Sequence, residues 1–568
     1  MSESTLFQKN LQKLAGYNPA LCQKLAAATP CPSRYRLLQS RSGELIPALI
    51  DADGITRPLH STVDPRREAE RLIAGMTDAS HDQTFLVFLG LGAGFAVEAA
   101  LQSNTVSQVI VIDYDLDGIA QLFGSIDFAK ILGDPRVTIA IDPEPGQIES
   151  LVLGQYLPAL SGGIKVIPLR ARTERDAPRF NAAFDAIQRA IEKVSADYSV
   201  QAYFGTRWFS NIIRNLRMLD QKTPACYAIP PDMKGRKDAA ICAAGPSLDI
   251  QINELAQKKQ KQRDLLIIAA DTALPALLAC GIKPDAVVSI DCQHISCYHF
   301  IGAECRNIPL FLDIASPPLL SGFSDKPIFF SGGHPLAHYV SHNVSFLPTL
   351  DTSGGNVTYA CLSLAESLGV QRIFIYGADF SYPQGRVYAR GTYIYPFFER
   401  KQNRLRPFEA QFSAFLYRSP FVPPETFAAN QNCIYETASL RSYRKSFEAK
   451  ASSLNAQVIP QPGMGVPIHI NNEKTKTIKG TSLDIVSLPD KINSVEFLKR
   501  YQNSIQSLPQ LNGPCSLHKL NDDEKQILST LLPLMAAIKR RNPALTACQV
   551  LEETKHYCVS QIGRVVSG

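Results

Sequence analysis

The sequence predicts an α/β protein of several domains, and three observations lead to that prediction. Apolar runs of strand length alternate with helical stretches over residues 84–142 and again over 238–300, which is typical of parallel sheets with buried strands. Residues 486–568 show helical periodicity alone. A chain of 568 residues is also too long for one hydrophobic core. We therefore expect a Rossmann-like N-terminal α/β domain over 1–222, a central α/β domain with a parallel sheet over 235–465, and a C-terminal helical domain over 486–568.

Composition and charge narrow the class of protein. Apolar residues make up 45% of the chain, as in ordinary globular proteins, and the net charge of +6 is too small to indicate nucleic-acid binding. No run of about 18 apolar residues occurs, and the N-terminal stretch lacks an apolar signal core. The 13 cysteines are scattered without CxxC pairs, which favours reduced core thiols. These features predict a cytoplasmic protein without a membrane span.

The N-terminal third begins with a segment that carries no evident site. Residues 1–80 read as a helical and irregular lead-in, with a short hairpin over Tyr35–Leu38 and Leu45–Asp51. Further along, residues 174–220 have the apolar spacing of long helices. Residues 221–237, rich in proline and charge, are predicted to be a linker.

A glycine-rich turn follows the first strand of the N-terminal α/β unit. The strand in TFLVFLGLGAGF runs into Gly90, Gly92 and Gly94, and Asp113 ends the next strand about twenty residues later. At that spacing an acid can reach a ribose hydroxyl, so the turn is typical of nucleotide-binding domains. Glycines at such a turn also serve to pack a strand closely against a helix. Both interpretations stay open at the level of the sequence.

Three strands of the central domain end in small, polar or acidic residues. They are expected at 238–243, 265–270 and 286–290. In parallel sheets ligands bind at the carboxyl ends of the strands. The residues that follow the three strands, and that we expect at a nucleotide site, are Gly245, Pro246, Ser247, Asp271, Thr272, Asp291 and Gln293.

The second half of the central domain repeats this arrangement. Strands are expected at 308–313, at 327–331 and in QRIFIY, and residues 435–458 add a helix and a last strand. A helix opens at Val357, and the free N–H groups at its start suit a phosphate. The turn before this helix and the end of QRIFIYGADFSY contribute Ser353, Gly354, Gly355, Asn356, Gly377, Asp379 and Tyr382. The glycine-bearing loop PQGRVYARGTY comes next and is predicted to act as a lid.

Two groups of residues could in principle bind a metal. Histidines spaced by four would share one face of a helix, but a proline follows the first and no acid accompanies them, so we expect no metal there. These are His334, His338 and His342. Aspartates at strand ends could hold magnesium beside a diphosphate. These are Asp291, Asp313 and Asp379.

The C-terminal part contains no catalytic constellation. Residues 466–485 are polar and lysine-rich and are predicted to be a linker. The helices expected beyond them could form a bundle that binds a partner, or a structural cap. The sequence favours neither.

Several motifs of the central stretch, in this order, resemble the motility-associated factor family of flagellin glycosyltransferases. The motifs are AAGPSLD, AADTAL, GIKPDAVVSIDCQ, TSGGNVTYACLSLAESLG and IFIYGADFSYPQGRVYARGTY, and GTRWFSNIIRNL precedes them. The resemblance covers most of residues 200–400 and extends plausibly to the whole chain. The central domain is also similar, more distantly, to bacterial sialyltransferases that use CMP-sialic acid, which implies a sialyltransferase-like fold.

The resemblance to sialyltransferases implies roles for particular residues. Gly245, Pro246 and Ser247 would hold the nucleotide, and Asp271 takes the place of an asparagine that contacts the donor. Residues 353–355 would line the cytidine and phosphate site. Tyr382 and Tyr388 match tyrosines that hydrogen-bond the leaving phosphate.

Two departures from the sialyltransferase pattern concern the chemistry. Ala244 stands where the sialyltransferases have asparagine. No histidine occurs near Tyr435–Thr437, where their base is expected, so Asp291 and Asp379 become the candidate catalytic residues.

The resemblance implies transfer of a nonulosonic acid, of the pseudaminic or legionaminic type, from a CMP-activated donor to Ser or Thr of flagellin, in support of flagellum assembly and motility. Two alternatives stay open. The central fold is also similar to archaeal 6-hydroxymethylpterin diphosphokinase, which uses ATP and magnesium. The missing histidine and Ala244 are compatible with a non-catalytic flagellin-binding protein. The tyrosine-bearing lid and the large flanking domains favour the transferase.

Overall fold

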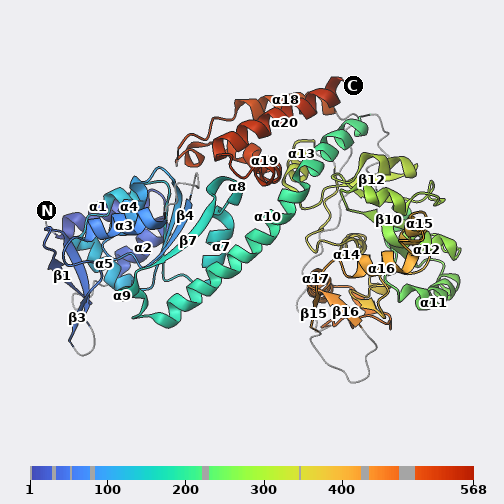
Figure 1. Cartoon of the computed structure of the whole chain (residues 1–568), viewed down its shortest axis with the longest axis horizontal. Helices are drawn as coiled ribbons and strands as arrows, with labels where there is room; N and C mark the ends of the chain where they lie inside the picture. Colours follow the sequence, from blue (N-terminus) through green and yellow to red (C-terminus); the bar gives the residue numbers. More distant parts are fainter. Residues whose placement is uncertain are drawn as a thin grey trace. The chain divides into compact units, whose positions relative to one another are not determined.

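The computed structural model describes residues 3–28, 34–50, 54–76, 84–220, 229–344, 347–423, 434–471, 493–513 and 515–567. The chain forms two compact units (Figure 1). Unit 1 comprises Met1–Gly205 with Ser504–Cys558, and unit 2 comprises Thr206–Asn503 with Val559–Gly568. Much of each predicted linker, over 221–237 and 466–485, lies outside the described residues.

The lead-in of unit 1 contains helices and a small antiparallel sheet. The helices are α1 (Glu3–Ala15), α2 (Pro19–Ala27) and α3 (Pro65–Met76). The strands are β1 (Tyr35–Gln39), β2 (Leu45–Ile50) and β3 (Thr56–Pro58), in the order β1-β2-β3. The predicted hairpin is thus present, with one further strand.

A four-stranded parallel sheet is the centre of unit 1, in the order β6-β5-β4-β7. Its strands are β4 (Thr84–Leu89), β5 (Val106–Asp113), β6 (Val137–Ile141) and β7 (Gly163–Pro168). The helices that follow them are α4 (Phe95–Gln102), α5 (Leu116–Ser125), α6 (Ala129–Leu132), α7 (Pro145–Gln155), α8 (Pro158–Ser161) and α9 (Arg170–Thr173). Separate apolar cores cover the two faces of the sheet, so the Rossmann-like prediction is confirmed.

Helix α10 (Ala177–Leu219) is one unbroken helix of 43 residues, where the sequence predicted several (Figure 1). Its first part packs against the sheet of unit 1 through Phe180 and Ile187. From Thr206 onward it belongs to unit 2, so the predicted boundary at 222 lies inside unit 2.

The C-terminal helices do not form a unit of their own. They are α18 (Ser494–Ser507), α19 (Asp522–Arg541) and α20 (Ala547–Ser567). Helix α19 and most of α20 belong to unit 1, and the start of α18 belongs to unit 2. Gly205 of α10 lies against the backbone of Pro533 in α19, where any Cβ would come within 1.9 Å of a carbonyl oxygen. The C-terminal helices are therefore divided between the two units.

Unit 2 contains a seven-stranded parallel sheet in the order β12-β11-β10-β9-β8-β13-β17. Its strands are β8 (Asp238–Cys242), β9 (Leu266–Ala270), β10 (Ala286–Ser289), β11 (Leu310–Asp313), β12 (Pro327–Phe330), β13 (Arg372–Tyr376) and β17 (Gln457–Pro460). The associated helices are α11 (Leu248–Lys261), α12 (Leu274–Ala279), α13 (Pro335–Val344), α14 (Val357–Ser367) and α17 (Ala438–Ser453). The chain winds from β8 out to β12 and then returns to the other side of β8. The topological switch point therefore lies between β8 and β13.

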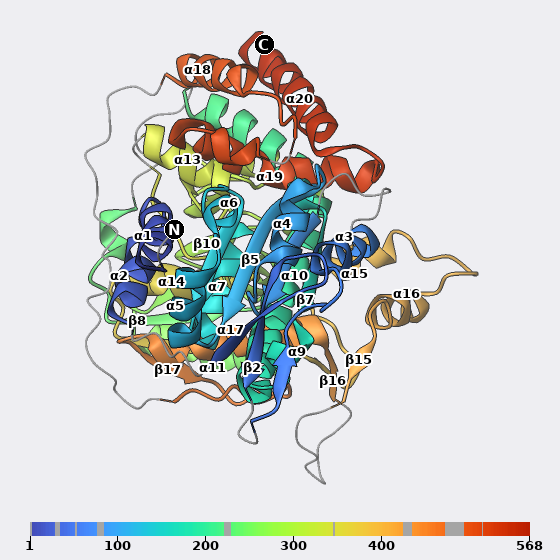
Figure 2. The same cartoon turned by 90° about the vertical axis from the view of Figure 1, so that its left-hand side faces the viewer.

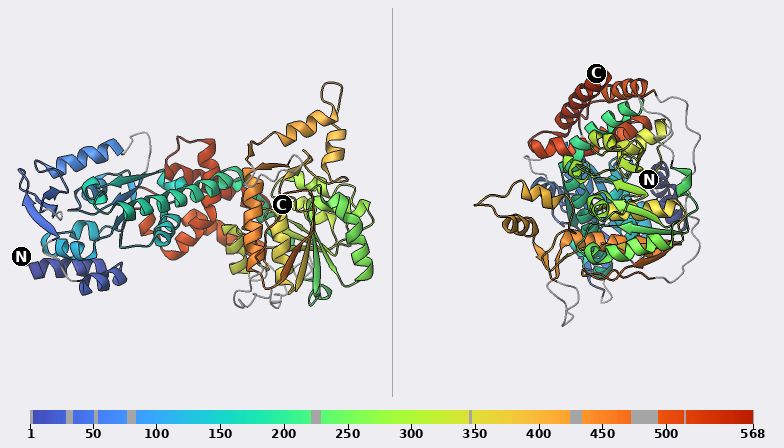
Figure 3. Two further views of the ribbon diagram at one scale, coloured as in Figure 1. Left: turned by 90° about the horizontal axis from the view of Figure 1, so that it is seen from below. Right: turned by 90° about the vertical axis from the view of Figure 1, so that its right-hand side faces the viewer.

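The lid is a small aromatic subdomain that stands out from the rest of unit 2 (Figures 2 and 3). It consists of a three-stranded sheet, β14 (Tyr382–Pro383), β16 (Ile434–Thr437) and β15 (Phe421–Val422), and helices α15 (Ile394–Glu399) and α16 (Phe408–Leu416). Its core is built around Phe398, and partly buried aromatic side chains, Tyr388 and Tyr393 among them, pack against it. Among the helices of the described ranges, none combines the length and the apolar character that crossing a bilayer requires.

Candidate functional site

The loops at the switch point are locked together by backbone contacts and one carboxylate. The Gly245 N–H donates to the Gly377 carbonyl at 2.8 Å, and Gly377 has a φ of 64°. A Cβ on Gly245 would lie 2.3 Å from a carboxylate oxygen of Asp379. Asp379 accepts the Ser247 N–H at 2.8 Å and the Ser247 hydroxyl on its other oxygen. Both carboxylate oxygens of Asp379 are thus occupied within the protein.

Ser247 also connects the switch point to the segment after β17. Its Oγ accepts the Met464 N–H at 2.6 Å. A cavity of about 320 Å³ lies beside Ser247. It is lined by Gln251 of α11, by Asp379, and by Gln461 and other residues of the segment after β17. Burial raises the pKa of Asp379, although the bonds from Ser247 oppose that rise. The geometry makes Ser247 and Asp379 positioning residues of the loop that the sequence assigned to the nucleotide.

Asp271, directly after β9, is the centre of a buried polar cluster. Its Oδ2 accepts the Ser289 hydroxyl at 2.6 Å, and its Oδ1 accepts the Thr272 N–H at 2.7 Å. His299 Nδ1 lies 3.2 Å from Oδ2. Burial raises the pKa of Asp271, but the neighbouring histidine and the hydroxyl donors outweigh burial and hold the pKa below its ordinary value. Asp271 is therefore a buried carboxylate that faces a histidine.

His299 Nδ1 makes no hydrogen bond within the described residues, but its separation from the Asp271 carboxylate is close enough for a base and its orienting acid. A carboxylate at one imidazole nitrogen fixes the ring and stabilises its protonated form, and the other nitrogen is then available to a substrate. His299 ends a 3-10 turn, His294–His299, that follows β10. Its ring is buried and lies 4.6 Å from the ring of Tyr393.

Asp291, beyond the end of β10, is the second carboxylate of the cluster. Its only donors within the described residues are the backbone and side-chain N–H groups of Gln293, at 2.9 and 3.4 Å. Burial and the nearby charge of Asp271 raise the pKa of Asp291. Titratable groups with pKa values shifted in opposite directions and gathered at strand ends are typical of functional sites.

Three tyrosines surround the two carboxylates. Tyr388 and Tyr393 come from the lid, with ring centroids 6.1 Å apart, and Tyr443 comes from α17. Burial, followed by the charges of neighbouring side chains, raises the pKa of each of the three. Within the described residues their hydroxyls have no hydrogen-bond partner. Half-buried phenols usually find a partner, so these three hydroxyls are available to a ligand.

The turn before α14 lies under Tyr443. A Cβ on Gly355 would come 3.2 Å from the Tyr443 ring, and Gly355 has a φ of 69°. The Asn356 side chain caps the helix by accepting the Tyr359 N–H at 3.0 Å. Ser353 bonds Asp351 through its N–H and its hydroxyl. The turn is therefore preorganised, and the start of α14 faces the same end of the sheet as Asp291.

Contacts at the base of the lid bring it onto the switch-point loop. The Ala389 N–H donates to the Ala244 carbonyl at 2.9 Å, and the Arg390 N–H donates to Asp249 at 2.8 Å. Arg386 forms an ion pair with Asp249. Tyr388 is thereby held near the cluster, whereas Tyr382 pairs with Tyr435 in the lid sheet.

Helix α10 supports the site from behind. The Asn211 amide donates to the carbonyls of Cys292 and Ala315, and the Asn215 amide donates to those of Ile314 and Ser316. One turn apart on the helix, these two buried asparagines fix the loops that follow β10 and β11. This is the structural role of the GTRWFSNIIRNL motif.

The structure does not gather the residues considered as metal ligands. The described residues contain no group of three His, Cys, Asp or Glu side chains placed to hold a metal ion. In the described part of the chain, Asp313 accepts only the Ala315 N–H, at 2.8 Å, and burial raises its pKa to about 7. His334 precedes α13 and packs edge-on against Trp208, and burial lowers its pKa to about 3. The predicted magnesium trio therefore does not fit one ion, because its members serve separate loops.

The glycine-rich turn of unit 1 is filled by the protein itself. A Cβ on Gly90 would contact Arg172, and one on Gly92 would lie 2.4 Å from His60 Nε2. The Arg172 guanidinium is fully buried and donates to Asp113 at 3.0 Å. Side chains thus occupy the space that a phosphate would need, which favours the packing interpretation of this turn.

Sequence reasoning missed the histidine of the site. It sought the base near residues 435–437, whereas His299 lies after β10. The HISCYH stretch that contains it directly follows the motif ending at Gln293. A histidine eight residues after the strand-end Asp291 was the available signal. Tyr393 and Tyr443 were missed because only tertiary packing brings these two side chains close to the carboxylates.

Residues 210–385 match the model of a family described as 6-hydroxymethylpterin diphosphokinase MptE-like. Uncharacterised proteins of Treponema pallidum (strain Nichols) are 34% identical over 189 residues and 30% identical over 175 residues. These matches cover 30% and 31% of the chain and 66% and 80% of the two relatives. A Maf glycosyltransferase structure from Magnetospirillum magneticum AMB-1 aligns with a TM-score of 0.59 and 14% identity, over 99% of this chain and 91% of that one.

The fold and the site together define a multidomain α/β protein with a candidate ligand site, lined by polar residues, at the carboxyl ends of its central sheet. The chain belongs to the MptE-like family. It shares the fold of the Maf glycosyltransferase, as the sequence motifs predicted.

Proposed function

We propose that the protein is a cytoplasmic glycosyltransferase that moves a nonulosonic acid from a CMP-activated donor to a serine or threonine hydroxyl of flagellin. The single observation that carries the proposal is the buried Asp271–His299 pair beside Asp291 and three tyrosine hydroxyls that have no partner among the described residues. The fold of the Maf glycosyltransferase supports the transferase class. The flagellin acceptor and the CMP donor rest on the motifs quoted above.

Each group has a role in the transfer. The acceptor oxygen forms a bond to the anomeric carbon, the bond from that carbon to the phosphate oxygen breaks, and CMP leaves. His299, oriented by Asp271, takes the proton of the acceptor hydroxyl. Tyr388 and Tyr393 donate to the departing phosphate, and the start of α14 adds N–H groups. Asp291 stabilises the positive charge of the oxocarbenium-like transition state.

We assign the base to His299 and not to Asp379. Asp379 is saturated by donors from Ser247, so it holds the loop of Gly245 and Pro246 in place. No step is routed through magnesium, because the strand-end aspartates do not converge on one point.

The test uses the purified full chain, flagellin and a CMP-nonulosonic acid. CMP release and the intact mass of flagellin are measured together. We expect His299→Ala to lower kcat by about 10³-fold, the size of a lost general base. His338→Ala is the matched control, since this histidine is exposed on α13, and its rate should stay unchanged.

Three other outcomes would contradict the assignment. Equal rates in both variants would remove His299 from the mechanism. Turnover of ATP with 6-hydroxymethylpterin, without CMP release, would establish the diphosphokinase that the family description suggests. Stable flagellin binding with no gain in mass would establish a non-catalytic binding protein.

A further inference from the structure

Among the described residues, strand β6 leaves one edge of the sheet of unit 1 unpaired. The Arg136 carbonyl accepts from Val109, and the Asp142 N–H donates to Asp113, so the even-numbered residues of this stretch face β5. Because strand residues alternate in direction, Ile139 and Ile141 turn their N–H and C=O groups outward. The Ile139 carbonyl takes one weak bond from the Asn18 amide, at 3.5 Å. In the described part of unit 1, the other three groups have no partner.

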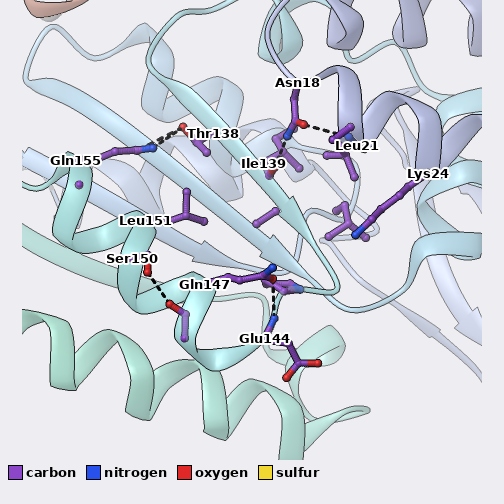
Figure 4. A pocket seen from close by; sticks show the side chains of 16 residues that line it. Asn18, Leu21, Lys24, Thr138, Ile139, Glu144, Gln147, Ser150, Leu151 and Gln155 are labelled. Atoms are coloured by element: carbon purple, nitrogen blue, oxygen red, sulfur yellow. Dashed lines mark hydrogen bonds between the residues drawn. The ribbon is translucent and has the colours of Figure 1, made fainter. Parts of the chain in front are cut away.

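This edge forms the floor of a groove of about 900 Å³ (Figure 4). Helix α2 supplies one wall, with Ala20, Leu21 and Lys24, and α7 supplies the other. Gln155 of α7 is held to Thr138 of β6 at 3.2 Å, which fixes the distance between that wall and the floor. The groove therefore runs along the unpaired edge and is open to an incoming chain.

Small residues on α7 keep the groove wide along this wall. Gly146, Ser150 and Gly154 are spaced by four and share one face of the helix. A Cβ at Gly146 or Gly154 would meet no atom within 4 Å, and neither has a left-handed φ. Packing and backbone conformation thus give no reason for these two glycines, although glycine weakens a helix relative to alanine. Their effect is to keep width in the groove.

We propose that the outer edge of β6 is a docking site for an extended segment of a partner polypeptide, which adds as a fifth strand to this sheet. Donors and acceptors that recur at every second residue are matched by an extended backbone, and strand addition to a sheet edge is an established mode of peptide recognition. The site lies in unit 1 and is independent of the catalytic cluster.

The walls specify the side chains of the segment. Successive residues of an added strand point alternately to α2 and to α7. Those that face α7 can be bulky and apolar, because Gly146 and Gly154 leave the space. Lys24 is exposed and has no ionic partner within the described residues, and its side chain points into the groove (Figure 4). An acidic residue of the segment would pair with it.

The experiment uses a phage-displayed library of random peptides of about ten residues, longer than a typical strand. The library is selected on the full chain and counter-selected on the variant Gly146→Leu/Gly154→Leu, which fills the groove. Gly75→Leu is the matched control, because Gly75 also lies in a helix with open space around it but outside the groove. Thermal melting verifies that each variant folds. Lys24→Glu provides a second probe that changes only an exposed side chain.

The proposal predicts apolar-acidic peptides that bind the wild type and Gly75→Leu equally. Their Kd should rise by about tenfold or more in the filled variant and in Lys24→Glu, as for a lost anchor. Bound peptide should slow hydrogen exchange at the amides of Ile139 and Ile141. Peptides that bind all variants equally, or no enriched peptide, would overturn the proposal. So would pairing of two copies of the chain through this edge, seen as a dimer in ultracentrifugation that the filled variant abolishes.

Discussion

The two parallel sheets of this protein carry similar strand-end residues, but they use them differently. In unit 1, Asp113 at the end of β5 is buried against the guanidinium of Arg172, and side chains fill the adjacent glycine turn. In unit 2, Asp271 and Asp291 have no such cation among the described residues, and the tyrosine hydroxyls around them lack partners there. The comparison indicates that a strand–glycine–helix turn is a candidate ligand site where its polar groups are left unsatisfied, and a packing element where side chains fill it.

The comparison extends to two buried aspartates in equivalent places. Asp113 has a guanidinium that stays charged, whereas Asp313, at the end of β11, has only a backbone N–H among the described residues. Burying a charge without a partner costs free energy, so its pKa moves toward the neutral form. Asp313 accordingly has its pKa raised by burial to about 7. Burial raises the pKa of Asp113 as well, but there the Arg172 guanidinium opposes the rise, and within the described residues no cation does so at Asp313.

The largest expected effect on stability comes from opening the closed turn of unit 1. Arg172→Met should lower the free energy of unfolding by about 3–5 kcal/mol, because Asp113 would stay buried without its cation. Urea denaturation measures the change. Arg170→Met, at an exposed position, should have little effect. Adding Asp113→Asn to Arg172→Met should restore part of the lost free energy of unfolding, because no unpaired charge is then buried. If it restores none, the ion pair does not stabilise this turn.

The opposite sign is expected at Asp313. Its folded pKa, about 7, lies above its unfolded value, so the folded state binds more protons between these two values. Stability therefore falls as the pH rises toward 7 and stays low above it. Asp313→Asn should remove this fall and raise the free energy of unfolding at pH 8 by up to about 4 kcal/mol. Thermal or urea denaturation from pH 5 to 8 measures this change in stability. Asp325→Asn, at an exposed position, is the control. If Asp313→Asn loses as much stability between pH 5 and 8 as the wild type does, the expectation is refuted.

The smallest effect tests the open site of unit 2. Tyr393→Phe removes one hydroxyl beside the Asp271–His299 pair and should lower kcat by about tenfold, which corresponds to about 1.4 kcal/mol. KM for the donor should change less, because the hydroxyl acts on charge that develops during departure of the phosphate. Tyr298→Phe, a more exposed neighbour of the lid, is the control. An unchanged kcat would mean that the Tyr393 hydroxyl does not contact the reacting phosphate.

Most strands could be read from the sequence, and the exceptions have physical reasons. Strands such as β5 and β9 are continuous apolar runs of strand length, which are local signals. Strand β7 was not predicted, because its half-exposed edge position allows Lys165 and Pro168 and breaks the apolar run. Helix α10 was expected to be interrupted, yet its apolar positions serve two units in succession without a break.

The sequence by itself determined the order of strands and helices, the polar strand ends and the likeness to the Maf family, because these depend on neighbours along the chain. Only the tertiary structure decided that His299 meets Asp271, that Asp379 locks onto Ser247, and that Arg172 closes the glycine turn. Each of these contacts joins residues of different elements. Their distances depend on how the strands pair and where the loops fold back, and no local pattern of side chains encodes that.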